Sequence, residues 1–268
     1  MKTDVVNSSM PPLGFSRAGE VPAKGWLGDI AYSRGTLEEF WGVICRWLRG
    51  ERRGNLTIGY VNPHVFNLAR RNATLRAFLA GADIVTVDGL GVAMAALLLN
   101  HVRQTRTVMT PLFDRVLSTS ELPPLTAALI GGSAEVVEKG AAAMNRASPR
   151  IQVVKTHHGY GSIHEYVDFI RAEPGTDLIL VAMGSPHSEE FIQAAAGQFP
   201  GTLFWSIGGG TLHFYAGTLR RVPRVVSTLG VQWLWRICNE PAIAPRYLVG
   251  IPVFFGSLLR LYFTRSNP

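Results

Sequence analysis

The stretch Leu178-Ile-Leu-Val-Ala-Met-Gly-Ser-Pro-His-Ser-Glu189 contains the pattern that decides the fold. Its first five residues, Leu178–Ala182, form an apolar run without a polar break, which is typical of a strand buried on both faces. A turn of small residues follows, and a helical pattern covers Glu189–Phe199. Strand, glycine turn and helix together predict one repeat of a parallel α/β sheet.

The same unit recurs through the middle of the chain. Further buried strands are predicted at Leu56–Val61, Ile84–Val87, Leu125–Ile130, Ile151–Thr156 and Leu203–Ile207. Helical patterns lie at Val65–Leu79, Leu90–Leu99, Ala134–Asn145 and Ile163–Arg171, and a capping box at Thr36–Glu39 opens a helix to about Arg49. We therefore expect an α/β fold, a Rossmann-like parallel sheet with helices on both faces.

Every predicted strand ends in a turn of small or polar residues. These turns are Asn62-Pro63-His64, Asp88-Gly89-Leu90-Gly91, Gly131-Gly132-Ser133, His158-Gly159-Tyr160-Gly161, Gly184-Ser185-Pro186 and Gly208-Gly209-Gly210-Thr211. Ligands of open α/β sheets lie at the carboxyl ends of the strands. Because backbone amides at helix N-termini can approach an anion there, the six turns together favour a nucleotide-type ligand.

Composition excludes several classes of protein. The chain has 268 residues, of which 47% are hydrophobic, so it can bury a substantial core and is not intrinsically disordered. Its two cysteines, Cys45 and Cys238, are too few for a disulfide scaffold and suit a reducing cytoplasm. The formal net charge is +7, and residues 217–268 hold seven arginines, no lysine and one acidic residue, Glu240. Such a basic, aromatic tail predicts a phosphate-bearing partner: a nucleotide, a nucleic acid or an anionic membrane.

The ends of the chain differ in character from its middle. We expect residues 1–27 to be a flexible segment without a signal peptide, residues 28–216 to be the Rossmann-like core, and residues 217–268 to be a helical basic appendage. The longest apolar stretch, Tyr247–Phe263, is interrupted by Pro252 and Arg260 and is shorter than the roughly 20 residues of a spanning helix. It is interpreted as a packed or surface-lying helix, with membrane spanning as the lesser alternative. No nucleic-acid-binding signature accompanies the basic tail, so nucleic acid is not an expected partner.

Asp88 allows two interpretations. A carboxylate at a strand end in a glycine turn is placed for general-base work, but it could equally cap the helix that follows. The segment Asp88–Met94 half-matches the dinucleotide fingerprint, although Met94 occupies the third small position, so an NAD-linked oxidoreductase is kept as a rival. The histidines His157, His158 and His164 lack zinc-site spacing, and no metal site is expected.

The tail arginines complement the turns. Arginine side chains offer planar forks for phosphate oxygens, and the candidates are Arg220, Arg221, Arg224, Arg236 and Arg246. If they fold over the strand ends, they would neutralise a departing diphosphate without a metal. A solvated basic face against a membrane is the alternative, and both roles can hold for different arginines.

Three stretches resemble the bacterial WecG/TagA/CpsF glycosyltransferases over about Leu56–Tyr247. They are Ala82-Asp83 through Asp88-Gly89-Leu90-Gly91-Val92, then Gly184-Ser185-Pro186 with Glu189, and the set Gly209-Gly210, Ala216-Gly217, Arg221-Val222-Pro223, Leu229-Gly230, Trp233-Leu234-Trp235-Arg236, Glu240-Pro241 and Arg246-Tyr247. The resemblance implies an inverting, metal-independent hexosyltransferase that uses no cofactor. Such enzymes move a sugar from a UDP-sugar to a polyprenyl-diphosphate-linked saccharide in surface or exopolysaccharide synthesis. They act as peripheral proteins on the cytoplasmic face of the plasma (inner) membrane, and a homo-oligomer is compatible with this role.

The resemblance also assigns roles to residues. It implies Asp88 as the base, with Arg236 and Arg246 closing over the donor diphosphate. The expected substrate-binding residues are Asn62, Arg106, Gly132, Tyr160, Gly184, Pro186, Ser188, Glu189, Gly209, Gly210 and His213. The chain departs from the family pattern at Ser188, His213 and Ile243. A non-catalytic member that binds lipid-linked sugar, or scaffolds a polysaccharide complex, is therefore the alternative function.

Overall fold

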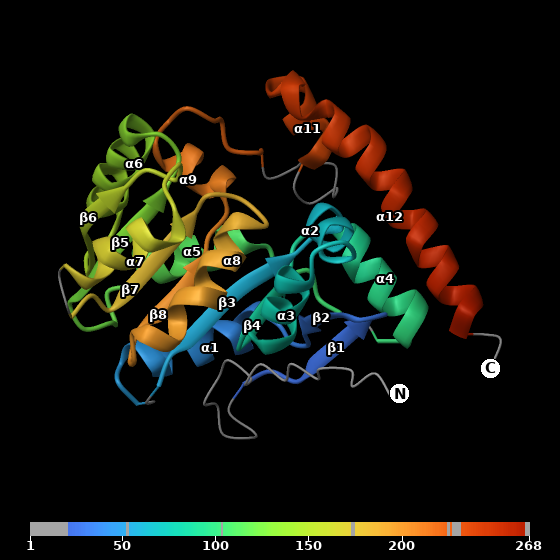
Figure 1. Cartoon of the computed structure of the whole chain (residues 1–268), viewed down its shortest axis with the longest axis horizontal. Helices are drawn as coiled ribbons and strands as arrows, with labels where there is room; N and C mark the ends of the chain where they lie inside the picture. Colours follow the sequence, from blue (N-terminus) through green and yellow to red (C-terminus); the bar gives the residue numbers. More distant parts are fainter. Residues whose placement is uncertain are drawn as a thin grey trace, which may run out of the picture.

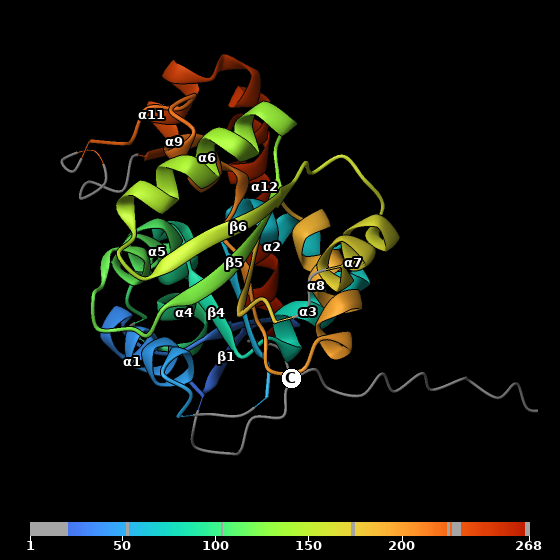
Figure 2. The ribbon, with the colours of Figure 1, turned by 90° about the vertical axis from the view of Figure 1, so that its left-hand side faces the viewer.

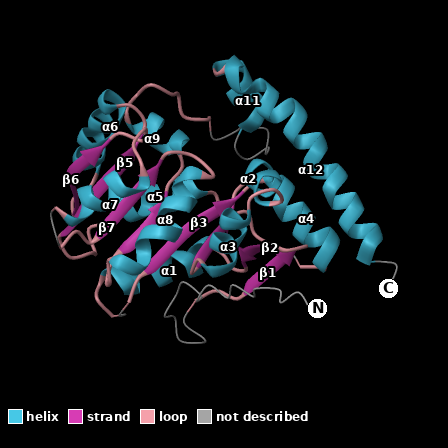
Figure 3. Ribbon diagram, viewed as in Figure 1, coloured by secondary structure: helices cyan, strands magenta, loops and turns pink. Residues whose placement is uncertain are grey.

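A six-stranded parallel sheet forms the centre of the computed structural model, which describes residues 21–51, 54–102, 104–172, 175–223, 226 and 232–265. The strands are β3 (Leu56–Val61), β4 (Ile84–Val87), β5 (Leu125–Gly131), β6 (Ile151–His157), β7 (Leu178–Ala182) and β8 (Leu203–Ser206). Their order in the sheet is β4-β3-β8-β7-β5-β6, and every adjacent pair is parallel (Figures 1 and 3). All six predicted strands are confirmed, as is the Rossmann-like α/β fold.

Helices cover both faces of this sheet, as the continuous apolar strands required. The helices α1 (Leu37–Leu48), α5 (Met109–Ser118) and α6 (Ala134–Ala147) lie on one face, and α3 (Ala73–Gly81), α7 (Ile163–Arg171) and α8 (His187–Ala195) lie on the other (Figure 2). The capping box that opens α1 is present. Glu39 N donates to Thr36 Oγ1 at 3.3 Å, and Thr36 N donates to Glu39 Oε2 at 2.7 Å.

Some helix boundaries differ from the prediction. The pattern Val65–Leu79 is two helices, α2 (Pro63–Ala69) and α3, because Asn72 caps the second one: its Oδ1 accepts from Leu75 N at 2.9 Å. The helix predicted from Glu189 begins earlier, at His187, and gives way at Ala196–Gln198 to a 3-10 turn, η1. Two helices, α5 and α9 (Gly209–Tyr215), were not predicted.

A short antiparallel hairpin precedes the sheet and was not predicted. Its strands are β1 (Lys24–Leu27) and β2 (Ile30–Ser33). The hairpin is attached to the core through Val85 N, which donates to Ser33 Oγ at 2.8 Å, and through the Lys24 ammonium, which donates to the carbonyl of Ala82. The four residues of β2 are buried, so this hairpin is an integral part of the core.

The tail forms helix α11 (Gln232–Asn239), a 3-10 turn, η2 (Pro241–Ile243), and the long helix α12 (Ala244–Arg265). Helix α12 packs on α2 and on α4 (Leu90–Asn100), with Phe254 fully buried edge-on against Phe66 at a ring-centroid distance of 5.1 Å. Over Ala244–Thr264 it is long and apolar enough to cross a membrane, and 17% of its most apolar window is buried in the protein. A core helix would be mostly buried, so α12 presents most of its surface outward.

The connections of the sheet create a crevice between two neighbouring strands. The chain leaves β5 through α6 toward β6 at one edge, and it leaves β7 through α8 toward β8 on the other side. Ligands of open α/β sheets occupy such a switch point. The two strands approach closely here, because a Cβ on Gly131 would lie 2.5 Å from the carbonyl oxygen of Ala182.

Candidate functional site at the carboxyl edge of the sheet

Asp88 lies between the end of β4 and the start of α4. Its backbone N donates to Val61 O at 2.9 Å, which fixes the turn to the neighbouring strand β3. The N-cap of α4 is Gly89, at φ +101°, and this residue has no side chain with which to cap the helix. The capping interpretation of Asp88 is therefore wrong, and its carboxylate is available for another role.

Four polar side chains surround that carboxylate. Burial raises the pKa of Asp88 above its usual value, and the positive charges of Arg106, Arg236 and Arg246 oppose the rise. A hydrogen bond from Asn62 also opposes the rise, and the pKa of Asp88 nevertheless remains above its usual value. These five residues come from five separate parts of the chain, so the fold itself assembles one carboxylate and three guanidinium groups at a single place. Of the predicted site residues, these are the ones that act on the Asp88 carboxylate.

Local structure fixes each member of this cluster. Asn62 is the N-cap of α2, and its Oδ1 accepts from Val65 N at 2.9 Å, which holds the side chain at the end of β3. The segment that carries Arg106 is fixed to β4 by two hydrogen bonds between Thr107 and the backbone of Val87. Thr107 N donates to Val87 O at 3.0 Å, and Val87 N donates to Thr107 Oγ1 at 3.1 Å.

Arg236 is oriented by a carboxylate just beyond the end of its own helix, α11. Its Nε and Nη2 donate to Glu240 Oε1 and Oε2 at 2.9 and 3.2 Å. A Cβ on Gly210 would lie 3.4 Å from Arg236 Nη1, so the guanidinium lies directly over the first turn of α9. An anion bound there would meet both the helix N-terminus and the arginine.

Arg246, on α12, has an unused donor at the site. Its Nε is buried and has no hydrogen-bond partner among the residues that the structure describes. Burial, and secondarily the Arg246 charge, lowers the pKa of His64 to about 4, so this neighbouring imidazole is neutral at physiological pH. A buried, unpaired guanidinium nitrogen is costly unless a ligand accepts from it.

Behind the cluster, Glu189 forms a buried polar network. Ser206 Oγ donates to Glu189 Oε1 at 2.8 Å, and Ser185 Oγ lies 3.0 Å from the same oxygen and 3.4 Å from the Tyr60 hydroxyl. Burial raises the pKa of Glu189 to about 7, and its Oε2 has no partner in the described part of the chain. Ser188 is also fully buried, and its Oγ accepts from Met183 N at 3.1 Å. Both side chains thus lie beneath the turn 184–186 and support it.

The other predicted substrate-binding residues lie along the same edge of the sheet. Gly132 and Gly184 adopt positive φ in the turns after β5 and β7, Pro186 is the N-cap of α8, and Gly209 and Gly210 begin α9. Tyr160 follows the edge strand β6 and is 81% exposed. His213 lies in the last turn of α9, where its Nδ1 is 2.7 Å from Thr218 Oγ1. Within the described residues, neither Tyr160 nor His213 forms a hydrogen bond or ion pair with Asp88.

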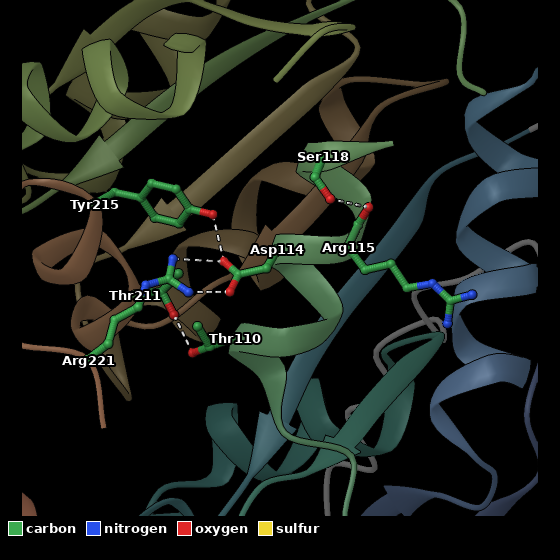
Figure 4. A network of polar contacts seen from close by, with 7 residues as sticks. All are labelled: Thr110, Asp114, Arg115, Ser118, Thr211, Tyr215 and Arg221. Carbon is green, nitrogen blue, oxygen red and sulfur yellow. Dashed lines mark hydrogen bonds and ion pairs between the residues drawn. The ribbon is translucent and has the colours of Figure 1, made fainter. Parts of the chain in front are cut away.

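Arg221, expected as a phosphate fork, is engaged elsewhere. Figure 4 shows both of its terminal nitrogens on the carboxylate of Asp114 on α5, with Nη2 to Oδ1 at 3.1 Å. The Tyr215 hydroxyl donates to the same Oδ1 at 2.6 Å, and Thr110 Oγ1 lies 3.0 Å from Thr211 Oγ1. Arg220 is exposed, whereas Arg224, Leu229 and Gly230 lie outside the described residues. The Asp114 pair was missed because α5 was not predicted.

A metal centre has no obvious set of ligands. Across the described ranges, no three His, Cys, Asp or Glu side chains gather as a metal ion would require. The histidines of the β6 turn belong to an aromatic cluster, in which the rings of His157 and His158 lie 4.6 Å apart and His157 also packs on Tyr166 and Phe169. The charged side chains that act on one another at Asp88 are its own carboxylate and the guanidinium groups of Arg106, Arg236 and Arg246.

Comparison with known proteins identifies similar chains. Residues 26–268 match the family described as the glycosyl transferase WecG/TagA/CpsF family. Among curated proteins, the chain is 29% identical over 239 residues to the N-acetylglucosaminyldiphosphoundecaprenol N-acetyl-beta-D-mannosaminyltransferase of Staphylococcus aureus strain MW2. That alignment covers 89% of this chain and 93% of the relative. The proteins of the same name from strains COL and MRSA252 match with the same identity and coverage.

Proposed function

The chain belongs to the WecG/TagA/CpsF family of glycosyl transferases, and we propose that it transfers a sugar, with inversion, from a UDP-sugar to a polyprenyl-diphosphate-linked saccharide. The observation that carries this proposal is the convergence of Arg106, Arg236 and Arg246 on Asp88. One buried base beside several fixed positive charges suits a reaction that removes a proton and releases a diphosphate. The S. aureus relatives, whose name describes a diphosphoundecaprenol-linked acceptor, support the lipid-linked substrate.

The reaction assigns a task to each group. Asp88 takes the proton of an acceptor hydroxyl while that oxygen attacks the anomeric carbon of the donor sugar. The new carbon–oxygen bond forms as the bond to the diphosphate breaks, and UDP leaves with the electron pair. Because attack and departure occur on opposite faces, the anomeric configuration inverts. Arg236 and Arg246 then compensate the charge that grows on the leaving diphosphate.

The donor's nucleotide is assigned to the switch point between β5 and β7. The turns 131–133, 184–186 and 208–210 lie at this edge of the sheet, and Arg236 covers the amides at the start of α9. A diphosphate there would be reached by guanidinium and backbone donors without any metal ion, so we propose that transfer is metal-independent. The unpaired Nε of Arg246 supports the same position for the phosphates.

We place the enzyme on the cytoplasmic face of the plasma membrane as a peripheral protein. The outward surface of α12 carries exposed apolar side chains, including Leu248, Val249, Leu259 and Phe263, beside Arg260. Apolar side chains with flanking arginines suit a helix that lies in the interface of an anionic bilayer. Such a location would bring the active site to its lipid-linked acceptor.

A donor screen tests the proposal. UDP-sugars are offered, with EDTA present, together with a polyprenyl-diphosphate saccharide, and the product is identified by mass; the Asp88→Asn variant is the matched control. The proposal expects one sugar added by the wild type and very little by the variant. The alternative, a non-catalytic member that binds lipid-linked sugar or scaffolds a complex, expects no product with any donor. Titration calorimetry with UDP distinguishes the two further, because an enzyme of this kind must bind the nucleotide.

A further inference from the structure

Helix α4 exposes an apolar stripe to the outside. Its eleven residues, Leu90–Asn100, include no charged side chain. The exposed members are Leu90, Met94, Leu97 and Leu98, of which Leu97 is 50% and Leu98 56% exposed. These positions recur at helical spacing and share one face, while Val92, Ala95 and Ala96 pack inward. A helix that faced only water would carry polar residues along that stripe.

The stripe begins at the reaction centre. Leu90 is two residues beyond Asp88, and Gly89 is the only residue between them. Eleven helical residues advance about 16 Å, so the stripe leads that far away from the carboxylate. Its far end meets the β1 hairpin, where Asn100 Nδ2 donates to Trp26 O at 2.8 Å and the Trp26 side chain is 42% exposed.

Helix α12, which carries further exposed apolar side chains, lies alongside α4. The two helices are in contact and run side by side (Figure 1). A Cβ on Gly91 would lie 3.2 Å from a ring carbon of Phe254, so the two helices pack tightly at this point. The stripe thus begins at the cluster of arginines around Asp88 and extends along α4, a helix that packs against α12.

We propose that this stripe on α4 binds the isoprenoid chain of the acceptor, and this inference rests on the proposed function. The occupant must have an anionic group at one end and a long apolar chain at the other. An acceptor diphosphate near Arg106, with Arg236 and Arg246 left to the donor, would place the first part of that chain on Leu90, and the rest would follow Met94, Leu97 and Leu98 toward the bilayer. Charge at one end and apolar surface along the rest match a prenyl diphosphate better than they match a second protein chain.

Two acceptors with the same saccharide diphosphate test the assignment, one with a long isoprenoid and one with a short, water-soluble prenyl group. The Leu97→Gln/Leu98→Gln variant is compared with Val154→Gln, which alters a similarly exposed apolar residue on β6. In detergent solution, the ratio of KM for the long acceptor to KM for the short one is expected to rise at least tenfold in the α4 variant only. An unchanged ratio in a folded α4 variant would overturn the proposal.

Photo-cross-linking gives a second readout that does not require transfer. A diazirine on the isoprenoid chain should label the peptide that contains residues 90–100 of the wild-type protein. Labelling confined to α12, or a dimer in light scattering that the Leu97→Gln/Leu98→Gln variant abolishes, would assign the stripe to bulk lipid or to a second copy instead. If no donor supports transfer while the α4 peptide is still labelled, the catalytic proposal fails and the lipid site stands.

Discussion

Arg236 is held on Glu240 by two hydrogen bonds, Nε to Oε1 at 2.9 Å and Nη2 to Oε2 at 3.2 Å, while its remaining nitrogen, Nη1, lies nearest to Gly210. The carboxylate therefore orients the guanidinium without covering the edge that faces the start of α9. An arginine positioned in this way is already ordered before any phosphate arrives, which reduces the entropy that binding must otherwise overcome.

Replacing Arg236 by lysine separates charge from orientation. Lysine keeps the positive charge but cannot form two parallel hydrogen bonds to Glu240. We expect the Arg236→Lys variant to lose about tenfold or more in kcat, because the charge is no longer fixed against the leaving diphosphate. Steady-state kinetics measures this loss, with Arg220→Lys as the control at an exposed arginine. Equal losses in both variants would remove Arg236 from the site.

Asp88 should control the acid limb of the pH–rate profile. Burial raises the pKa of its carboxyl group, so kcat/KM is expected to fall at a pH above the ordinary range for aspartate as the base becomes protonated. The Asp88→Asn variant should lose about 10²- to 10⁴-fold in kcat and should no longer show that limb. UDP affinity, measured by calorimetry, serves as the control for an intact site. A variant that turns over at the wild-type rate would show that another group takes the proton.

Glu189 should make stability depend on pH. Burial raises its pKa from 4.5 in an exposed setting to about 7, so the folded protein keeps the proton while the unfolded chain has already released it. The free energy of unfolding is thus expected to fall as pH rises from about 4.5 to about 7, by on the order of 3 kcal/mol. The Glu189→Gln variant has no titratable group at this position and should lack the part of the decline that Glu189 causes. Urea unfolding at pH 5 and pH 8 measures both proteins, and parallel curves would contradict the prediction.

Gly131 should be intolerant of any side chain. An added Cβ would lie 2.5 Å from the carbonyl oxygen of Ala182, and backbone atoms cannot move aside as a side chain can. We expect the Gly131→Ala variant to lose on the order of 3 kcal/mol of stability as β5 and β7 separate. Gly201→Ala is a useful comparison, since it also substitutes a glycine of positive φ but meets no atom within 4 Å. Equal melting temperatures for the two variants would contradict a close approach at the switch point.

The exposed side of α12 should determine membrane binding. Leu259 and Phe263 lie one helical turn apart and are 59% and 65% exposed. The Leu259→Gln/Phe263→Gln variant should bind anionic vesicles at least about tenfold more weakly, because two apolar side chains no longer enter the bilayer. Vesicle co-sedimentation measures the effect, with Val154→Gln as the control. Unchanged binding would exclude this side of the helix as the membrane contact.

The strands could be predicted from the sequence, whereas contacts between residues far apart in the chain could not. Unbroken apolar runs such as Leu178–Ala182 mark buried parallel strands directly, and the Thr36 capping box marks the start of α1. Asn72 is an ordinary polar residue in a helical pattern, so the division between α2 and α3 was not visible. The partner of Arg221 lies 107 positions away, on a helix whose pattern was not recognised.

In the candidate site, too, some features were predictable from the sequence and others depended on packing. Asp88 and the tail arginines could be proposed because a carboxylate in a glycine turn and a basic tail are visible as patterns. The complete burial of Ser188 and Glu189 was not predictable, since it depends on how α8 packs against β7 and β8. Whether Asp88 caps α4 was likewise decided only by the turn geometry at Gly89.

The two-residue interval between Asp88 and Leu90 limits how far the reacting sugar can lie from the lipid diphosphate. Where Leu90 touches a prenyl chain, the hydroxyl that Asp88 deprotonates must belong to a sugar close to the lipid diphosphate, because the helix begins at the base itself. A long, already extended glycan would carry its growing end far out of range of that carboxylate. The short distance from Asp88 to the start of α4 thus limits the length of the acceptor saccharide, and it restricts such an enzyme to the early additions of a glycan.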